Sequence, residues 1–189
     1  MPIGALELVG PVMSRLVERR PRSVLDLGIG FGFYGAAVRQ WLDLGVRPWA
    51  TRLVGVEGWA GYRSPCWDLY DAVHIAELGE WLSRDAEPFD AILLLDVIEH
   101  FDLDHGAAVA EAARKRLSQS GLLLIGTPAI WMPQGACYGN EFERHRSLWT
   151  AELLTDLGCE ILVNGSMLLG VVPRIEQRAL ESTSGRTTT

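Results

Sequence analysis

Residues 24–32 read Val-Leu-Asp-Leu-Gly-Ile-Gly-Phe-Gly, and this stretch decides the fold. An apolar run holds one acid, Asp26, and is followed by Gly28, Gly30 and Gly32 at every second position. The pattern predicts a buried strand that turns sharply into a helix, because glycine adopts positive φ and lets the backbone approach a ligand closely. The first N–H groups of such a helix are free to bind. A carboxylate two residues before the first glycine suits a cationic, amino acid-like ligand better than a phosphate.

The rest of the chain alternates between strand and helix patterns, which predicts a doubly wound, Rossmann-like α/β fold. We expect strands at 23–27, 52–57, 72–76, 89–95, 122–126, 160–163 and 167–172. We expect helices at 6–20 (in two parts around Pro11), 32–44, 104–117 and 150–157. Only Asn164-Gly165-Ser166 separates the last two strands, which indicates a C-terminal β-hairpin. The prediction is therefore a mostly parallel seven-stranded sheet with one antiparallel strand near its edge.

Length and composition place limits on the class of protein. The chain has 189 residues, and we expect one domain over 1–180 and a disordered polar tail at 181–189. A net charge of −7 without a basic stripe argues against broad nucleic-acid binding. No apolar run reaches the ~20 residues of a membrane span, and no signal-peptide pattern is present. Three scattered cysteines fit a cytoplasmic protein. The aromatic, irregular stretch 58–70 could be a contact surface of a homo-oligomer.

Four neighbouring strands each present an acid at or just beyond their carboxyl end: Asp26, Glu57, Glu77 and Asp96. In open α/β sheets ligands bind beyond the carboxyl ends of the strands, so these acids should line one rim. Such a rim suits a ligand with hydroxyls, amines and positive charge. The glycines alone leave a second possibility open, since residues 30–35 also match the dinucleotide pattern G-x-G-x-x-G.

Three segments in order resemble class I S-adenosylmethionine-dependent methyltransferases that act on small molecules. The spacing from Asp26 to Gly32 resembles their first motif, and Asp-Val-Ile-Glu-His at 96–100 resembles their fourth. His-Arg-Ser-Leu-Trp at 145–149 is similar to the stretch before the penultimate helix in a subset of them. The resemblance implies S-adenosylmethionine as cofactor and in-line methyl transfer to a small acceptor. It also implies that Asp96 faces the methionine end of the cofactor and that Glu99 and His100 lie below the transfer site.

Several residues then have expected roles at the cofactor. Glu57, in the turn with Gly58, would accept hydrogen bonds from both ribose hydroxyls, which a carboxylate can do. Glu77 would accept from the adenine amino group, and Trp59 or Ile75 would flank the adenine ring. Buried Asp26 would be satisfied by N–H groups of the glycine loop or by the cofactor ammonium.

A long irregular segment, 128–148, is expected to cover the acceptor, since loops of this length are usually functional. It contains Trp131, Met132, Gln134, Cys137 and Tyr138. His145 is the first candidate for a general base or substrate-orienting group, and His100 is the second. Acids just before a helix usually cap it, so Asp102 and Asp104 are interpreted as caps, and no metal ligand is predicted.

Two other functions remain open from the sequence. A nicotinamide-dependent oxidoreductase of Rossmann type would account for residues 30–35 and Glu57, but not for Asp26 or the acids after the fourth strand. A non-catalytic module that keeps the fold and binds the cofactor would account for all the motifs. Titration with cofactors distinguishes the oxidoreductase from a methyltransferase, and turnover with a panel of substrates distinguishes the non-catalytic module from a methyltransferase.

Overall fold

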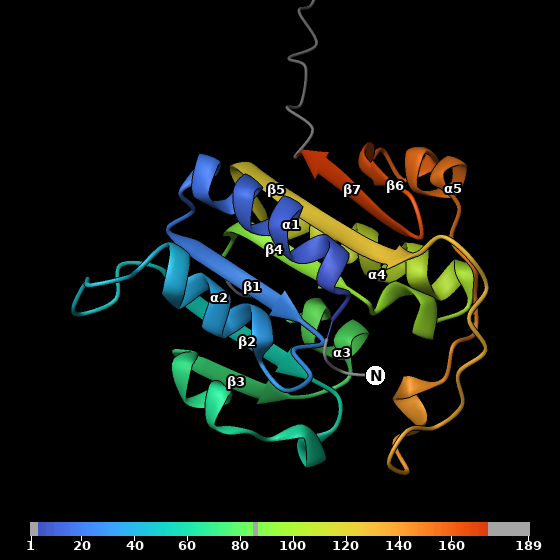
Figure 1. The fold of residues 1–189 in the computed structure, drawn as a ribbon, viewed down its shortest axis with the longest axis horizontal. Helices are drawn as coiled ribbons and strands as arrows, with labels where there is room; N and C mark the ends of the chain where they lie inside the picture. Colours follow the sequence, from blue (N-terminus) through green and yellow to red (C-terminus); the bar gives the residue numbers. More distant parts are fainter. Residues whose placement is uncertain (1–3, 85–86, 174–189) are drawn as a thin grey trace, which may run out of the picture.

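A computed structural model describes residues 4–84 and 87–173; the tail predicted at 181–189 lies outside them. Seven strands form one sheet in the order β3-β2-β1-β4-β5-β7-β6 (Figure 1). Strand β7 runs antiparallel to both its neighbours, β5 and β6, and the other pairs are parallel. The predicted fold class is therefore confirmed. The strands are β1 Ser23–Leu27, β2 Arg52–Glu57, β3 Ala72–Ile75, β4 Phe89–Leu95, β5 Leu117–Pro128, β6 Glu160–Asn164 and β7 Met167–Pro173.

Helices cover both faces of the sheet (Figure 1). One face packs against α1 (Leu6–Arg19), α2 (Phe33–Trp41) and the 3₁₀ helix η2 (Pro65–Leu69), through residues such as Leu16, Val38 and Trp67. The other face packs against α3 (Leu78–Ser83), α4 (Leu103–Lys115) and α5 (Ala151–Asp156), through Trp81, Val109 and Leu154. Apolar burial on both faces explains the unbroken apolar run of β4.

The structure corrects the predicted bounds of the first two helices. Helix α1 is continuous through Pro11 rather than divided in two. The proline removes one backbone hydrogen bond, but Leu8, Val12 and Leu16 on the buried face hold the helix against the sheet. Helix α2 ends at Trp41 rather than at residue 44.

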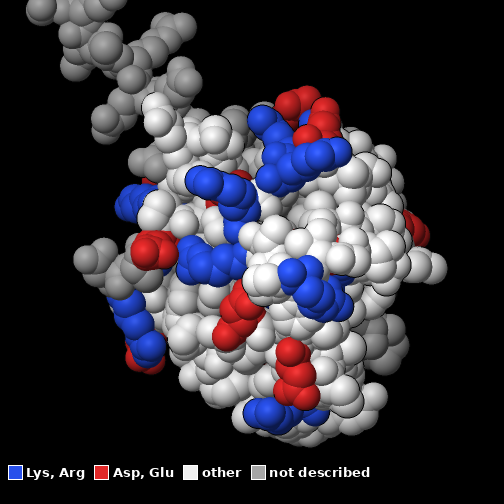
Figure 2. Space-filling model, turned by 90° about the vertical axis from the view of Figure 1, so that its left-hand side faces the viewer, with Lys and Arg blue, Asp and Glu red and all other residues white. Residues whose placement is uncertain are grey.

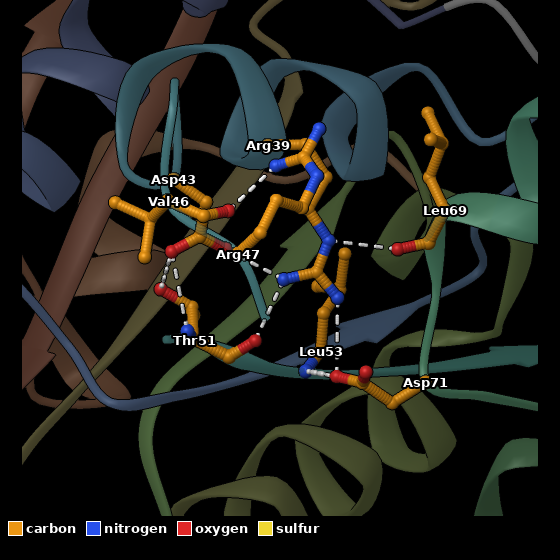
Figure 3. Close-up of polar contacts among 8 residues, drawn as sticks. All are labelled: Arg39, Asp43, Val46, Arg47, Thr51, Leu53, Leu69 and Asp71. Carbon is orange, nitrogen blue, oxygen red and sulfur yellow. Dashed lines mark hydrogen bonds and ion pairs between the residues drawn. The ribbon is translucent and has the colours of Figure 1, made fainter. Parts of the chain in front are cut away.

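An ion-paired cluster around Arg39 explains why α2 ends early (Figure 3). The buried Arg39 guanidinium donates to Asp43 Oδ2 at 2.7 Å, to the Thr51 carbonyl at 2.7 Å and to Asp71 Oδ2 at 3.1 Å. Asp43 also accepts from the Thr51 N–H at 3.2 Å and from its hydroxyl at 3.0 Å. These contacts direct Asp43 toward the start of β2, and the chain leaves the helical path.

Two further elements differ from the prediction. Strand β5 extends five residues earlier and two later than the predicted 122–126, because it pairs with β4 from Leu117 and with β7 as far as Pro128. Helix α3 was not predicted, because its six residues are too few to show a helical period. Glu77 caps it by accepting from the Glu80 N–H at 3.0 Å.

The stretch 58–70, expected as a possible contact surface, packs most of its aromatic side chains into the core. It contains two short 3₁₀ helices, η1 (Ala60–Tyr62) and η2. Tyr62, Trp67 and Tyr70 are buried in the core beside α2. This segment instead holds the glycine loop in place.

Basic and acidic side chains share one face of the molecule. Figure 2 shows the face at the amino ends of the parallel strands, and in its described part basic and acidic side chains lie next to one another. Within 4–84 and 87–173, no helix is both long and apolar enough to span a membrane.

Candidate functional site

A cavity of about 570 Å³ opens at the carboxyl ends of β1, β2 and β4, between the glycine loop and the 128–148 loop. The predicted site residues that line it are Asp26, Gly28, Gly30, Glu57, Gly58, Glu77, Asp96, His100 and His145. The predicted residues that do not line it are Gly32, Trp59 and Ile75. Gly32 faces Cys66 and Trp67, and Trp59 stacks edge-on against Tyr62 at 4.7 Å.

The glycine loop is shaped by backbone that only glycine adopts readily. Gly28 has φ of 76°, and a Cβ there would collide with Val97 Cγ2. Two side chains from the 58–70 stretch fix the loop. Trp67 donates its indole N–H to the Gly30 carbonyl at 2.8 Å, and Ser64 donates its hydroxyl to the Phe31 carbonyl at 2.6 Å. These two hydrogen bonds hold the backbone of the loop in place.

Asp26 has a different partner from the one predicted. Its Oδ2 accepts a hydrogen bond of 2.6 Å from the Tyr70 hydroxyl, not from the glycine loop. The side chain is 3% exposed. Burial raises the pKa of Asp26 to about 7, the Tyr70 hydrogen bond opposes this rise, and the Glu57 charge adds to it. The carboxyl group thus lies near its titration point at neutral pH.

Glu57 is held by backbone at both oxygens. Its Oε2 accepts from the Gly30 N–H at 2.9 Å, and its Oε1 accepts from the Trp59 N–H at 2.9 Å. Burial raises the pKa of Glu57, while these N–H groups favour the charged form. Each carboxylate oxygen has a second lone pair, so the fixed carboxylate can still accept hydroxyl groups of a ligand.

Asp96 comes directly after β4 in the left-handed conformation, with φ of 54°. Its Oδ2 accepts from the Ala5 N–H at 2.7 Å, which closes the cavity with the segment before α1. Burial raises the pKa of Asp96. Nearby, the hydroxyl of buried Tyr34 has no hydrogen-bond partner among the described residues and lines the same cavity. A polar ligand atom would satisfy it.

A second group of polar side chains, on η3 and at the end of the 128–148 loop, lines the same cavity. The rings of His100 and His145 are 4.9 Å apart, and the carboxylate of Glu99 lies next to them. Burial and the neighbouring His145 lower the pKa of His100 to about 4, and burial lowers the pKa of His145. Burial and the Asp96 charge raise the pKa of Glu99 to about 8. Both imidazoles are therefore neutral at pH 7.

The 128–148 loop is irregular, as predicted, apart from the 3₁₀ helix η4 (Glu141–Glu143) and an isolated bridge between Cys137 and Asn140. Met132 and Gln134 line the cavity, whereas Trp131, Cys137 and Tyr138 do not. Asp102 caps α4 by accepting from the His105 N–H at 2.9 Å, as expected.

Sequence reasoning missed several lining residues, namely Tyr62, Asn140, Phe142 and Glu143. Phe142 packs against Gly58, where a Cβ would lie 3.3 Å from its ring. The two positions are far apart in sequence, so no local pattern could pair them. Phe142 is therefore an aromatic side chain beside the Glu57 turn that lines the cavity, whereas Trp59 does not line it.

Comparisons of the sequence with models of known families and with curated proteins gave no match. Comparison of the structure with solved structures gave many matches, and those described next are methyltransferases or members of an O-methyltransferase family.

An O-methyltransferase family protein from Burkholderia thailandensis shares 18% identity over 90% of this chain and 57% of its own, with a TM-score of 0.64. This chain therefore spans little more than half of that protein. A second match from the same organism is 1,6-didemethyltoxoflavin-N1-methyltransferase, solved with 1,6-didemethyltoxoflavin and S-adenosylhomocysteine. It shares 18% identity over 89% of this chain and 77% of its own, with a TM-score of 0.63. An amino pentose methyltransferase from Micromonospora echinaspora, solved with S-adenosylmethionine, shares 15% identity over 89% and 91%, with a TM-score of 0.61. At these identities the likeness lies in the fold.

Proposed function

We propose that this protein transfers a methyl group from S-adenosylmethionine to a small-molecule acceptor. The observation that carries the proposal is a set of three acids around one cavity under the glycine loop: buried Asp26 and Glu57, and half-buried Asp96. Burial raises the pKa of all three carboxyl groups, so a ligand that brings positive charge and hydrogen-bond donors would stabilise their charged forms. A ligand with an ammonium, a sulfonium and a ribose diol supplies that charge and those donors.

The positions of the acids suggest how the cofactor would be held. Glu57, fixed by two backbone N–H groups, is suited to accept the ribose hydroxyls. Asp26 and Asp96 are suited to the methionine end, with the unpartnered Tyr34 hydroxyl near them. Glu77 lines the cavity beyond β3 and is suited to the adenine amino group. Phe142, against Gly58, is suited to the adenine face.

A nicotinamide cofactor fits the same cavity less well. Its pyrophosphate would lie at the glycine loop, where Asp26 and Glu57 are both buried close by. Two negative groups brought together in a low-dielectric site repel strongly. The structural relatives named above that hold a cofactor hold S-adenosylmethionine or S-adenosylhomocysteine, which agrees with the same choice.

The protein's contribution to the reaction would be positioning, exclusion of water and proton removal. Bound S-adenosylmethionine would supply a methyl group on a good leaving group. The cavity walls, with the 128–148 loop, would align an acceptor nucleophile with that methyl group. His145 is kept neutral by burial, so it could take a proton from the acceptor, with His100 as the other candidate.

Calorimetric titration of the purified protein with S-adenosylhomocysteine, with NADH in parallel, tests the proposal. Roughly micromolar 1:1 binding of the first and none of the second is the expected result. Binding of NADH alone would overturn the proposal in favour of an oxidoreductase. Binding of S-adenosylhomocysteine without methylation of any acceptor in a broad panel of hydroxyl, amine and activated-carbon compounds would favour a non-catalytic module.

A further inference from the structure

We propose that Glu99, His100 and His145 bind a divalent transition-metal ion, which holds the oxygen of a hydroxylated acceptor at the methyl-transfer site. The proposal rests on the proposed methyl transfer for its purpose, but the ion site rests on its own geometry. One carboxylate oxygen and one imidazole nitrogen from each histidine all lie within 4.8 Å of one another. An ion with bonds of about 2.1 Å keeps tetrahedral ligands ~3.4 Å apart, so side-chain adjustments of about 1 Å would close the site.

The hydrogen bonds of the two histidines leave the correct nitrogen for an ion. His145 Nδ1 is 2.7 Å from the Met132 carbonyl, and His100 Nδ1 is 3.4 Å from the Arg144 carbonyl. A carbonyl only accepts, so each Nδ1 carries the hydrogen and each Nε2 keeps its lone pair. Metal-binding histidines in proteins are oriented by such contacts to backbone carbonyls.

Glu99 is supported in a similar way. The Thr127 hydroxyl donates to its Oε2 at 3.1 Å, and the side chain is only 3% exposed. Its own carbonyl accepts from the N–H groups of Arg146 and Ser147, at 2.8 and 3.2 Å. These contacts attach the start of the His145 segment to the η3 turn (Ile98–His100), which carries Glu99 and His100. His100 and His145, which are 45 positions apart in the sequence, are thereby held in one cluster.

Charge also favours a cation at this place. Glu99 is buried, and Asp96, three residues earlier, lines the same cavity. A divalent ion would compensate the two carboxylates, and two nitrogens with one oxygen form a ligand set that suits zinc, cobalt or manganese better than magnesium.

The cluster has the composition of a catalytic metal site rather than a structural one. Three protein ligands leave at least one coordination position open, and all three residues line the cavity with Asp96. A hydroxyl group bound at the open position would lose its proton to solvent more easily. Its oxygen lone pair would then form the new O–CH₃ bond while the C–S bond breaks and its electron pair stays on sulfur. The products are a methyl ether, S-adenosylhomocysteine and one proton. In this arrangement the histidines hold the ion instead of accepting the proton.

Metal titration of the full chain, stripped with a chelator, tests the ion site without any methyl donor. Calorimetry with Zn²⁺ and visible absorption with Co²⁺ should show one ion per chain, with d–d bands typical of nitrogen and oxygen ligands. Mg²⁺ should bind more weakly. Glu99→Gln, His100→Ala and His145→Ala should each raise the Kd by at least ~10-fold. His74→Ala, which removes an exposed histidine outside the cavity, should leave it unchanged.

Circular dichroism of each variant shows whether it is folded, and three single variants keep the test valid if one of them is not. Absence of 1:1 binding, or equal binding by wild type and all three variants, would overturn the ion site. S-adenosylhomocysteine binding is measured on the same stripped protein. If the cofactor binds and the ion does not, the ion site is rejected and the proposed function stands. If the ion binds and the cofactor does not, the proposed function is rejected and the ion site stands. Chelator-insensitive methylation of a hydroxyl acceptor would reject the ion's role in the reaction.

Discussion

The Tyr70 hydroxyl donates a hydrogen bond of 2.6 Å to Asp26 Oδ2 and accepts one of 3.0 Å from the Gly35 N–H. Through this one side chain, the acid at the end of β1 is tied to the first turn of α2, on opposite sides of the glycine loop. The pair sets both the orientation and the proton affinity of Asp26. Near-isosteric substitutions of Asp26 or Tyr70 can therefore change the charge at this point of the cavity while the side chains keep their shape.

Replacing Asp26 by asparagine should weaken S-adenosylhomocysteine binding by roughly 10- to 100-fold. The variant keeps an oxygen that accepts from Tyr70 but loses a charge-assisted hydrogen bond to the ligand ammonium, worth about 1.5–3 kcal/mol. Calorimetric titration measures the Kd. Asp68→Asn is the matched control, because Asp68 is 76% exposed and lies outside the cavity. Equal affinities of the Asp26 variant and the wild type would show that Asp26 only supports the loop.

Replacing Tyr70 by phenylalanine should move the pH dependence of ligand binding upward. The Tyr70 hydrogen bond favours the charged form of Asp26, so its loss raises the Asp26 pKa further above about 7. Titrations at several values between pH 6 and 9 should show the rise in affinity at a higher pH than in the wild type. The Gly35 N–H also loses its acceptor, so the free energy of unfolding should fall by about 1–3 kcal/mol. If the pH dependence of affinity is the same in Tyr70→Phe and the wild type, the titration of Asp26 does not control ligand binding.

The ligand-free protein should become less stable as the pH rises from 6.5 to 8. Burial raises the pKa of Asp26 from 3.8 to about 7 and that of Glu99 from 4.5 to about 8. A raised carboxyl pKa contributes stability below the unfolded-state pKa, and this contribution is lost as the pH passes the folded-state value. His100, with its pKa lowered to about 4, acts in the opposite direction below 6.5, so the window above it is the informative one.

Thermal unfolding between pH 6.5 and 8 checks this trend. Tm should fall with pH in the wild type, and Asp26→Asn combined with Glu99→Gln should flatten the slope. A Tm that rises with pH across this window would contradict the assigned proton affinities.

Arg39→Met should cost about 3–5 kcal/mol of unfolding free energy, because it leaves buried Asp43 without its cation. Urea denaturation measures the change. Arg63→Met is the control, since the Arg63–Asp68 pair is 3.6 Å apart and mostly exposed, and exposed pairs contribute little. Similar losses in the two variants would mean that the Arg39 cluster is not what anchors the loop between α2 and β2.

The sequence predicted what depends on local pattern and failed where distant segments meet. Strands β1, β2 and β4 were predicted at their observed bounds, since a buried parallel strand is a continuous apolar run ended by a turn. The partner of Asp26 was missed because Tyr70 lies 44 residues away. The cluster of Glu99 with His145 was missed for the same reason, because it depends on how the 128–148 loop folds back over η3.

His145→Ala should reduce turnover by roughly 10²-fold or more while leaving S-adenosylhomocysteine affinity nearly unchanged. The His145 ring lies beside His100 at the acceptor end of the cavity, away from the glycine loop and Glu57. Its loss therefore removes proton transfer or ion binding at the acceptor and leaves the groups proposed to hold the cofactor in place. Single-turnover rates with a methylated product as readout, beside calorimetry for the cofactor, separate the two effects. His74→Ala should change neither quantity. If His145→Ala turns over at the wild-type rate, the ring serves only to hold the 128–148 loop through the Met132 carbonyl.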